Sequence, residues 1–298
     1  MSKTEIDHYI LSKPNLSDNS KRTYRKNYEN LSDLMQTNHI NDESQENIYN
    51  KIKTLKNANT RHMLVNIAIM IKKYNNSKHT DLIKRRELIR TDIKDNRNER
   101  KEYKKDELPE FKELIRYRNE LYSENNYKAY IINYILIEFS TRNKDLDLII
   151  TDSLQEFRKF KKEEKENVLY VANNGKNYYM RNSYKTHRTY GKLLNIFTNK
   201  KFNNAVKDYI KEQREQDIKQ IYLLNTNNGE RIGKDSLAHH IMRFTLNGIS
   251  ESDINKISVS RVTDMKQYKL LKKISKNRPT SIQTLIEEYS LSIEEPKS

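Results

Sequence analysis

The stretch VLYVANNGKNYYMRNSY, residues 168–184, carries the clearest strand pattern in the chain. Two runs rich in β-branched and aromatic residues, 168–171 and 178–184, flank a turn at 173–175 whose Asn-Asn-Gly sequence suits a hairpin. A third run of this kind follows at 192–196. Together these segments predict one small antiparallel β-sheet in the C-terminal half of the chain.

On both sides of this sheet the sequence returns to helical patterns. Only 5 glycines and 4 prolines interrupt 298 residues, and Leu, Ile, Lys and Glu recur at helical spacing. We expect helices at residues 21–35, 48–55, 60–74, 109–121, 125–139, 203–213, 234–246, 251–257, 262–274 and 280–289. The expected fold class is therefore mainly α with a small antiparallel β-sheet.

The N-terminal part predicts a small helical domain. Its apolar residues fall on one side of each helix at spacings of three and four. They are Tyr24, Tyr28, Leu31, Leu34 or Met35, then Ile48, Ile52 and Leu55, then Met63, Ile67, Met70, Ile71 and Tyr74. Basic residues such as Arg25 and Arg61 lie between these stripes, and they suit either a DNA backbone or an ordinary solvated face.

A highly charged segment separates this part from the rest. Residues 84–107 are nearly all charged, with Ile89 and Ile93 as the main exceptions, which indicates either a solvated helix or a linker. We therefore predict a helical domain at 1–85, a charged linker at 86–106 and a second domain at 107–298.

The net charge favours a polyanionic partner. Lys and Arg number 57 against 41 Asp and Glu, a formal charge of +16. Nucleic-acid phosphates would relieve the self-repulsion of such an excess, although Lys-rich codon usage of an AT-rich genome gives a similar composition. The absence of cysteine excludes disulfides and thiolate metal sites and favours an intracellular setting. No apolar run reaches the roughly 18 residues of a membrane span, and no signal peptide is recognised at the start.

Common enzyme signatures are missing from the sequence. There is no glycine-rich phosphate loop and no nucleophile elbow. His239 and His240 are adjacent, so on a helix they point about 100° apart and cannot share one metal ion. The carboxylates are scattered and define no two-metal nuclease cluster.

One ordered set of residues does suggest chemistry. Arg142 follows a strongly apolar helix, Lys185 ends a strand before the Tyr190-Gly191 turn, Arg261 follows Ile257-Ser258-Val259-Ser260, and Tyr289 lies on the last helix. Each also has a structural interpretation: Arg142 as a partner for helix-end carbonyls, Lys185 as one of many surface lysines, and Tyr289 as packing. Arg261 near a helix start would be unfavourable for the helix dipole, which favours a functional role.

In order and context this set resembles the catalytic domain of tyrosine recombinases, the phage-integrase-like family. Ser140-Thr141-Arg142-Asn143-Lys144-Asp145-Leu146 is similar to the family's Thr-Gly-x-Arg-x-x-Glu-Leu, with Asp145 in the acidic position. Lys185 lies in a predicted hairpin, as the family's lysine does, and Arg261 fits a His-x-x-Arg box. The Tyr184-Lys185-Thr186 stretch resembles most closely the divergent recombinases of large DNA viruses and their satellites.

The sequence also departs from the family pattern. Ser258 stands where the box has histidine, and the Gly-His pair before the tyrosine is missing. Thr280 lies nine residues before Tyr289, at the position of that histidine, and Arg278 is a nearby polar substitute. These departures leave open an inactive descendant that only binds DNA, beside the wider alternative of an unrelated helical nucleic-acid-binding protein.

The resemblance implies a site-specific recombinase or integrase that cuts and rejoins double-stranded DNA. Residues 1–85 would be its core-binding, DNA-binding domain, and residues 107–298 its catalytic domain. Tyr289 would form a 3′-phosphotyrosyl intermediate, Arg142 and Arg261 would hold the phosphate oxygens, and Lys185 would protonate the leaving 5′-oxygen. No metal ion or nucleotide cofactor is expected. The resemblance also implies a homo-oligomer, a tetramer on DNA, in which residues 290–293 after Tyr289 dock on a neighbouring subunit, inside a host cell or a virion.

Overall fold

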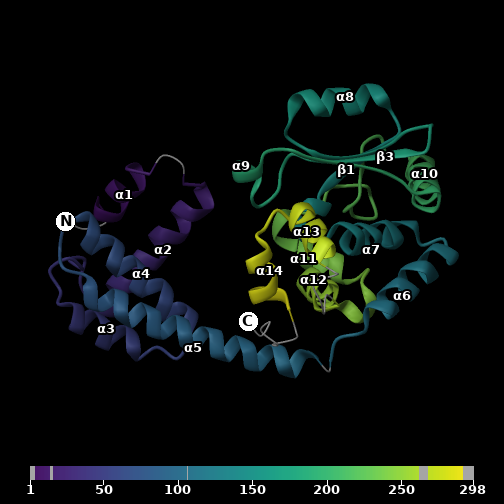
Figure 1. Cartoon of the computed structure of the whole chain (residues 1–298). Coiled ribbons are helices and arrows are strands. Elements are labelled where there is room, and N and C mark those ends of the chain that lie inside the picture. The colour runs from purple at the N-terminus through teal and green to yellow at the C-terminus, as the bar shows by residue number, and fades with distance from the viewer. Residues whose placement is uncertain (1–3, 14–15, 106, 262–267, 291–298) are drawn as a thin grey trace. The chain divides into compact units, whose positions relative to one another are not determined.

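The computed structural model describes residues 4–13, 16–105, 107–261 and 268–290. The chain divides into two compact units, Met1–Lys104 and Lys105–Ser298 (Figure 1). Each unit has a hydrophobic core of its own. The first part of the helix expected at 262–274, and the expected docking tail beyond Ser290, lie outside the described residues.

The N-terminal unit is helical, as its apolar stripes predict. It contains α1 (Thr4–Leu11), α2 (Asp18–Met35), α3 (Gln45–Lys53), α4 (Ala58–Tyr74) and α5 (Thr80–Lys105). The side chains of Ser17, Ser44 and Asn57 accept a backbone N–H at the starts of α2, α3 and α4. These caps pair donors that a helix start would otherwise leave unsatisfied.

The core of this unit confirms two of the three expected apolar faces. Tyr28 and Leu31 of α2 and Ile48 and Ile52 of α3 are almost fully buried. In α4 the buried residues are Leu64, Val65, Ile67, Ala68, Ile69 and Ile71, whereas Tyr74 is 43% exposed. The expected face of α4 was partly wrong because apolar residues surround this helix, so that packing rather than spacing decides which side is buried.

The charged segment forms a helix. The residues expected as a linker at 86–106 fall almost entirely within α5, of which Leu82 and Ile89 are buried in the N-terminal core. The domain boundaries expected at 85 and 107 stay a prediction.

The C-terminal unit contains a mixed five-stranded sheet in the order β4-β3-β2-β1-β5. Its strands are β1 (Leu148–Thr151), β2 (Asn167–Val171), β3 (Lys176–Arg181), β4 (Leu193–Thr198) and β5 (Ile221–Tyr222). The expected hairpin is β2–β3, and the next expected run is β4. The expectation of an antiparallel sheet was wrong in one respect, because β1 pairs in parallel with β2 through the crossover helix α8 (Leu154–Glu163).

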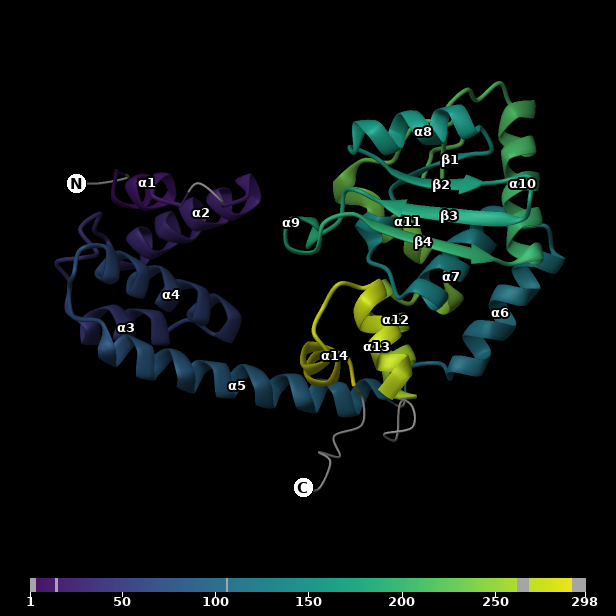
Figure 2. The same ribbon diagram turned by 45° about the horizontal axis from the view of Figure 1, so that its top comes forward.

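Helices cover both faces of this sheet (Figure 2). Phe157 of α8 packs on one face against Val168 and Tyr170. The other face, including Leu169 and Val171, joins the main core with α6 (Phe111–Ser123), α7 (Tyr127–Phe139) and α10 (Lys200–Glu215). Burial on both faces requires apolar residues throughout a strand, which explains why β1 and β2 lack alternation.

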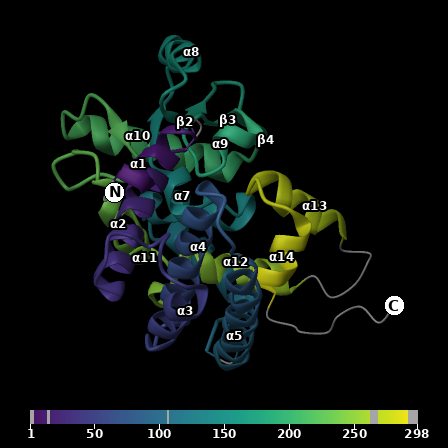
Figure 3. The ribbon, with the colours of Figure 1, turned by 90° about the vertical axis from the view of Figure 1, so that its left-hand side faces the viewer.

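The remaining C-terminal helices lie beside α7. They are α11 (Leu237–Met242), α12 (Glu251–Ser260), α13 (Tyr268–Asn277) and α14 (Ile282–Tyr289). The last three lie close together (Figure 3) and are joined by a small apolar cluster of Val259, Leu271, Ile274 and Leu285. None of the described helices has both the length and the apolar composition that crossing a bilayer requires.

Candidate active site

A sharp turn after the buried helix α7 positions Arg142. Ser140 adopts the left-handed conformation, with φ of 47°, and ends the helix. Arg142 then caps the 3-10 turn η1 (Asn143–Leu146), and its backbone N–H donates to the Asp145 carboxylate over 3.3 Å. The sequence expectation that Arg142 follows an apolar helix is confirmed.

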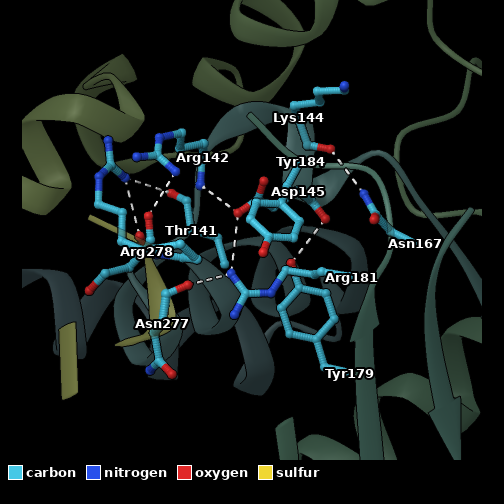
Figure 4. Close-up of polar contacts among 12 residues, drawn as sticks. Thr141, Arg142, Lys144, Asp145, Asn167, Tyr179, Arg181, Tyr184, Asn277 and Arg278 are labelled. Carbon is cyan, nitrogen blue, oxygen red and sulfur yellow. Dashed lines mark hydrogen bonds and ion pairs between the residues drawn. The ribbon is translucent and has the colours of Figure 1, made fainter. Parts of the chain in front are cut away.

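Arg278 lies directly beside this turn. It follows α13, and its guanidinium is almost completely buried, with 2% of the residue exposed. Nη1 donates to the carbonyl oxygens of Ser140 and Thr141, over 3.1 and 3.2 Å. In return, Arg142 Nη1 donates to the carbonyl oxygen of Arg278 over 2.7 Å, so the two arginines fix each other's backbone (Figure 4).

Tyr289 completes this group from the end of α14. Arg278 Nη2 donates to the Tyr289 hydroxyl over 3.0 Å and to the Glu251 carboxylate over 2.5 Å. The guanidinium also lies 4.8 Å from the centre of the Tyr289 ring. Segments from α7, α12, α13 and α14 therefore meet at one partly exposed phenol, with Arg142, Arg278 and Glu251 as its charged neighbours.

The electrostatics of this group are dominated by the two arginines. Burial, together with the neighbouring Arg278, lowers the pKa of Arg142. Burial acts to lower the pKa of Arg278 as well, but Glu251 and Tyr289 offset it and the pKa is raised. Arginine remains charged in either case. Among the described residues, Glu251 is the carboxylate in contact with Arg278, so the two arginines give this group an excess of positive charge that favours an anionic ligand.

Lys185 lies on an exposed loop next to this group. The loop joins β3 to the short helix α9 (His187–Tyr190), so Lys185 lies within the β3–β4 connection but after the strand rather than at its end. The neighbouring Thr186 hydroxyl donates to the carbonyl oxygen of Pro279 over 3.2 Å. This contact ties the Lys185 loop to the segment that follows Arg278.

Arg261 occupies a different position from the one expected. It caps the C-terminal end of α12 rather than a helix start, so its positive charge is favourable for the helix dipole. The expectation of an unfavourable position, which had favoured a functional role, was wrong. Its guanidinium lies 3.7 Å from the centre of the Phe111 ring. There it lines a cavity of about 130 Å³ together with Glu138 and Lys273. The interactions seen for Arg261 among the described residues are with the Phe111 ring and the charge of Glu138, not with Tyr289.

We expect Arg261 to contribute less to any reaction at Tyr289 than Arg142 does. Replacing Arg261 with alanine should lower strand cleavage by less than about tenfold, because the contacts seen for Arg261 are with Phe111 rather than Tyr289. Single-turnover cleavage rates of the two alanine variants measure this. A loss for Arg261→Ala as large as that for Arg142→Ala would contradict the position described here.

Of the residues expected near the missing histidines, Ser258 and Thr280 do not point to a role like that of Arg278. Ser258 is 1% exposed, and its hydroxyl has no hydrogen-bond partner among the described residues. The Thr280 backbone N–H donates to Ser275 over 3.3 Å, and its carbonyl oxygen accepts from the Ser275 hydroxyl over 2.5 Å. Ser258 is thus closed to a substrate, while the backbone of Thr280 shapes the turn before α14.

Sequence reasoning missed the polar network that supports the arginines. Arg181 is fully buried and donates to the Asp145 carboxylate over 3.3 Å and to the Asn277 carbonyl over 2.5 Å (Figure 4). Burial raises the pKa of Asp145, and the charge of Arg181 opposes this. Asp145 lies in the turn that Arg142 caps, and Asn277 directly precedes Arg278. The network therefore fixes both arginines relative to the sheet.

We expect this network to be a large contributor to stability. Replacing Arg181 with methionine removes a buried cation and leaves the Asp145 carboxyl and the Asn277 carbonyl without their hydrogen-bond donor. The free energy of unfolding should fall by about 3–5 kcal/mol. Urea unfolding of the full chain measures the change, with Arg158→Met on the exposed surface of α8 as the matched control. Equal unfolding free energies for the two variants would contradict the role of Arg181.

Comparisons with known proteins leave the family open. No protein-family model matches the chain, and no curated protein matches it. Among solved structures, the chain is similar to the crystal structure of XerA recombinase, with a TM-score of 0.39 and 12% sequence identity. That match covers 98% of this chain and 94% of the XerA chain. A likeness this distant does not assign a function.

Proposed function

We propose that this chain is a tyrosine-type DNA recombinase, which binds double-stranded DNA and exchanges strands through Tyr289. The observation that carries the proposal is the meeting of Arg142, Arg278 and Tyr289 from three separate segments of the chain. A phenol beside paired guanidinium groups is suited to attack a phosphodiester, whose charge the cations stabilise. The net charge of +16 supports a DNA partner.

The contacts support different roles for the two arginines. Arg142 is partly exposed and uses Nη1 for the Arg278 carbonyl, which leaves its other donors for the phosphate oxygens. Arg278 is a positioning residue, because its Nη1 and Nη2 groups already bind two carbonyls, Glu251 and the Tyr289 hydroxyl. It orients the phenol and holds the Arg142 turn in place.

The reaction would proceed by two transesterifications. The Tyr289 oxygen attacks phosphorus and loses its proton to solvent, and the bond to the 5′-oxygen breaks while Lys185 supplies the proton to that oxygen. A 5′-hydroxyl of another strand then reverses these steps. By the resemblance of its motifs, the chain would act as a homo-oligomer on two duplexes, and the viral type of recombinase stays the narrower prediction.

A second function has specific support, namely DNA binding without strand transfer. Arg261 packs on Phe111 and Ser258 is buried, so two expected catalytic positions are not available as the family pattern requires. The Arg278–Glu251 pair would then serve only to stabilise the C-terminal helices. This protein would bind duplexes in a salt-dependent manner and leave them intact.

Covalent trapping distinguishes these functions. The purified chain is incubated with nicked duplexes whose sequence around the nick is randomised, so that an unknown target is included in the pool. A recombinase would give a protein–DNA band that survives denaturing electrophoresis and needs no added metal ion. Salt-sensitive binding of the same pool without such a band would favour the binding protein.

A further inference from the structure

A second basic site lies in the C-terminal unit. A cavity of about 540 Å³ is lined by Lys128 from the first turn of α7, by residues 225–228, and by His240, Arg243 and Phe244 in and after α11. Three basic side chains line this cavity, and none of its lining residues is acidic. The cavity therefore has the charge of an anion site.

Neutral groups hold Lys128 at the cavity wall. Its ammonium group donates to the Asn225 carbonyl over 2.9 Å and to the Asn225 side chain over 2.6 Å. Asn225 is buried and is itself fixed by Gln213, to which it donates over 2.7 Å. Burial without a carboxylate lowers the pKa of Lys128 to about 8. The Lys128 charge is thus fixed in place but not neutralised.

Arg243 adds a second positive charge to the cavity, and His240 adds a buried ring nitrogen. The His240 Nε2 atom is buried and has no hydrogen-bond partner among the described residues. Burial, followed by the charges of Lys128 and Arg243, lowers the pKa of His240. Arg243 is exposed, and no ion pair links it to a carboxylate in the part of the chain that the structure describes.

This pattern differs from that of several other cations of the C-terminal unit. Several cations elsewhere in the unit have carboxylate partners, as Arg181 has Asp145 and Arg231 has both Asp147 and Glu166. Arg118 likewise pairs with Glu138. Unpaired charge is costly where water is partly excluded, and a bound anion would remove that cost.

We propose that Lys128, His240 and Arg243 form a binding site for a phosphate group. Lysine and arginine are the side chains that bind phosphate most strongly, and the forked donors of arginine match its oxygens. The phosphate is either free or part of a DNA backbone, since both present the same oxygens. This site is separate from Tyr289 and does not depend on the chemistry there.

Removal of Arg243 tests this inference, because the side chain is exposed and its loss should leave the fold intact. Arg243→Gln is compared with Arg158→Gln, an equal charge change on the exposed surface of α8. Thermal unfolding is measured with increasing inorganic phosphate against chloride at equal ionic strength. Affinity for a short duplex is measured by fluorescence anisotropy.

A free-phosphate site predicts that phosphate raises the melting temperature of the wild type and of Arg158→Gln but not of Arg243→Gln. A backbone-phosphate site predicts that Arg243→Gln weakens duplex binding at least about tenfold relative to Arg158→Gln. Arg243→Lys should restore part of either effect. The inference is overturned if Arg243→Gln matches Arg158→Gln in both measurements. Tyr289→Phe should change neither, so this result is independent of strand transfer.

Discussion

Replacing Tyr289 with phenylalanine should abolish covalent linkage to DNA while leaving duplex affinity nearly unchanged. The phenylalanine ring keeps the position beside the Arg278 guanidinium, which lies 4.8 Å from the ring centre, but it has no oxygen to attack phosphorus. Loss of a nucleophile lowers the rate by roughly 10⁶-fold. The measurement is the yield of covalent complex on nicked duplexes, with duplex affinity determined in parallel.

Tyr190→Phe is the matched control for this variant. Tyr190 lies in the same unit, is 51% exposed, and has no contact with the Arg142–Arg278 group among the described residues. It should form covalent complex at the wild-type rate. Linkage by Tyr289→Phe at that same rate would remove Tyr289 from the reaction.

Replacing Arg142 with alanine should lower the cleavage rate by about 10²–10³, the usual effect of removing one preorganised donor from a transition-state oxygen. Arg142 is the partly exposed arginine of the pair, and its donors beyond Nη1 are the ones available to phosphate. Its contact with the Arg278 carbonyl also fixes the segment that orients Tyr289. Single-turnover cleavage under saturating protein measures the chemical step apart from binding.

Arg142→Lys distinguishes charge from geometry. Lysine retains the charge but cannot offer two parallel N–H groups to a phosphate, so it should recover only a small part of the lost rate. Duplex affinity should fall much less than the rate does for either variant. Equal losses in affinity and rate would instead show that Arg142 only binds DNA.

Local sequence signals predicted some parts of the site correctly. Arg142 follows a helix whose residues are apolar on every side, and the hairpin at 168–181 is defined by its strand runs and its Asn-Asn-Gly turn. Both features depend on short stretches of sequence. The position of Tyr289 on the helix expected at 280–289 was predicted for the same reason, because helical spacing is a local pattern.

Other parts depend on contacts that sequence spacing does not contain. Glu251 lies in the first turn of α12, where an acidic residue is common, and its sequence position gives no sign that it pairs with Arg278, 27 residues further on. Arg181 ends a strand that should alternate, and only the fold shows it buried against Asp145. The parallel strand β1 is four residues long and fully buried, so its apolar run could not be distinguished from the end of a helix.

The central claim is that Tyr289 is the residue that joins covalently to DNA, and mass spectrometry of the linked complex tests it most directly. The complex formed on nicked duplexes is digested with protease and nuclease, and the modified peptide is sequenced. The account predicts a single nucleotide-bearing tyrosine at position 289 among the 20 tyrosines of the chain. A nucleotide on any other residue would contradict the account. So would the absence of any nucleotide-bearing peptide from protein that binds the duplex to saturation.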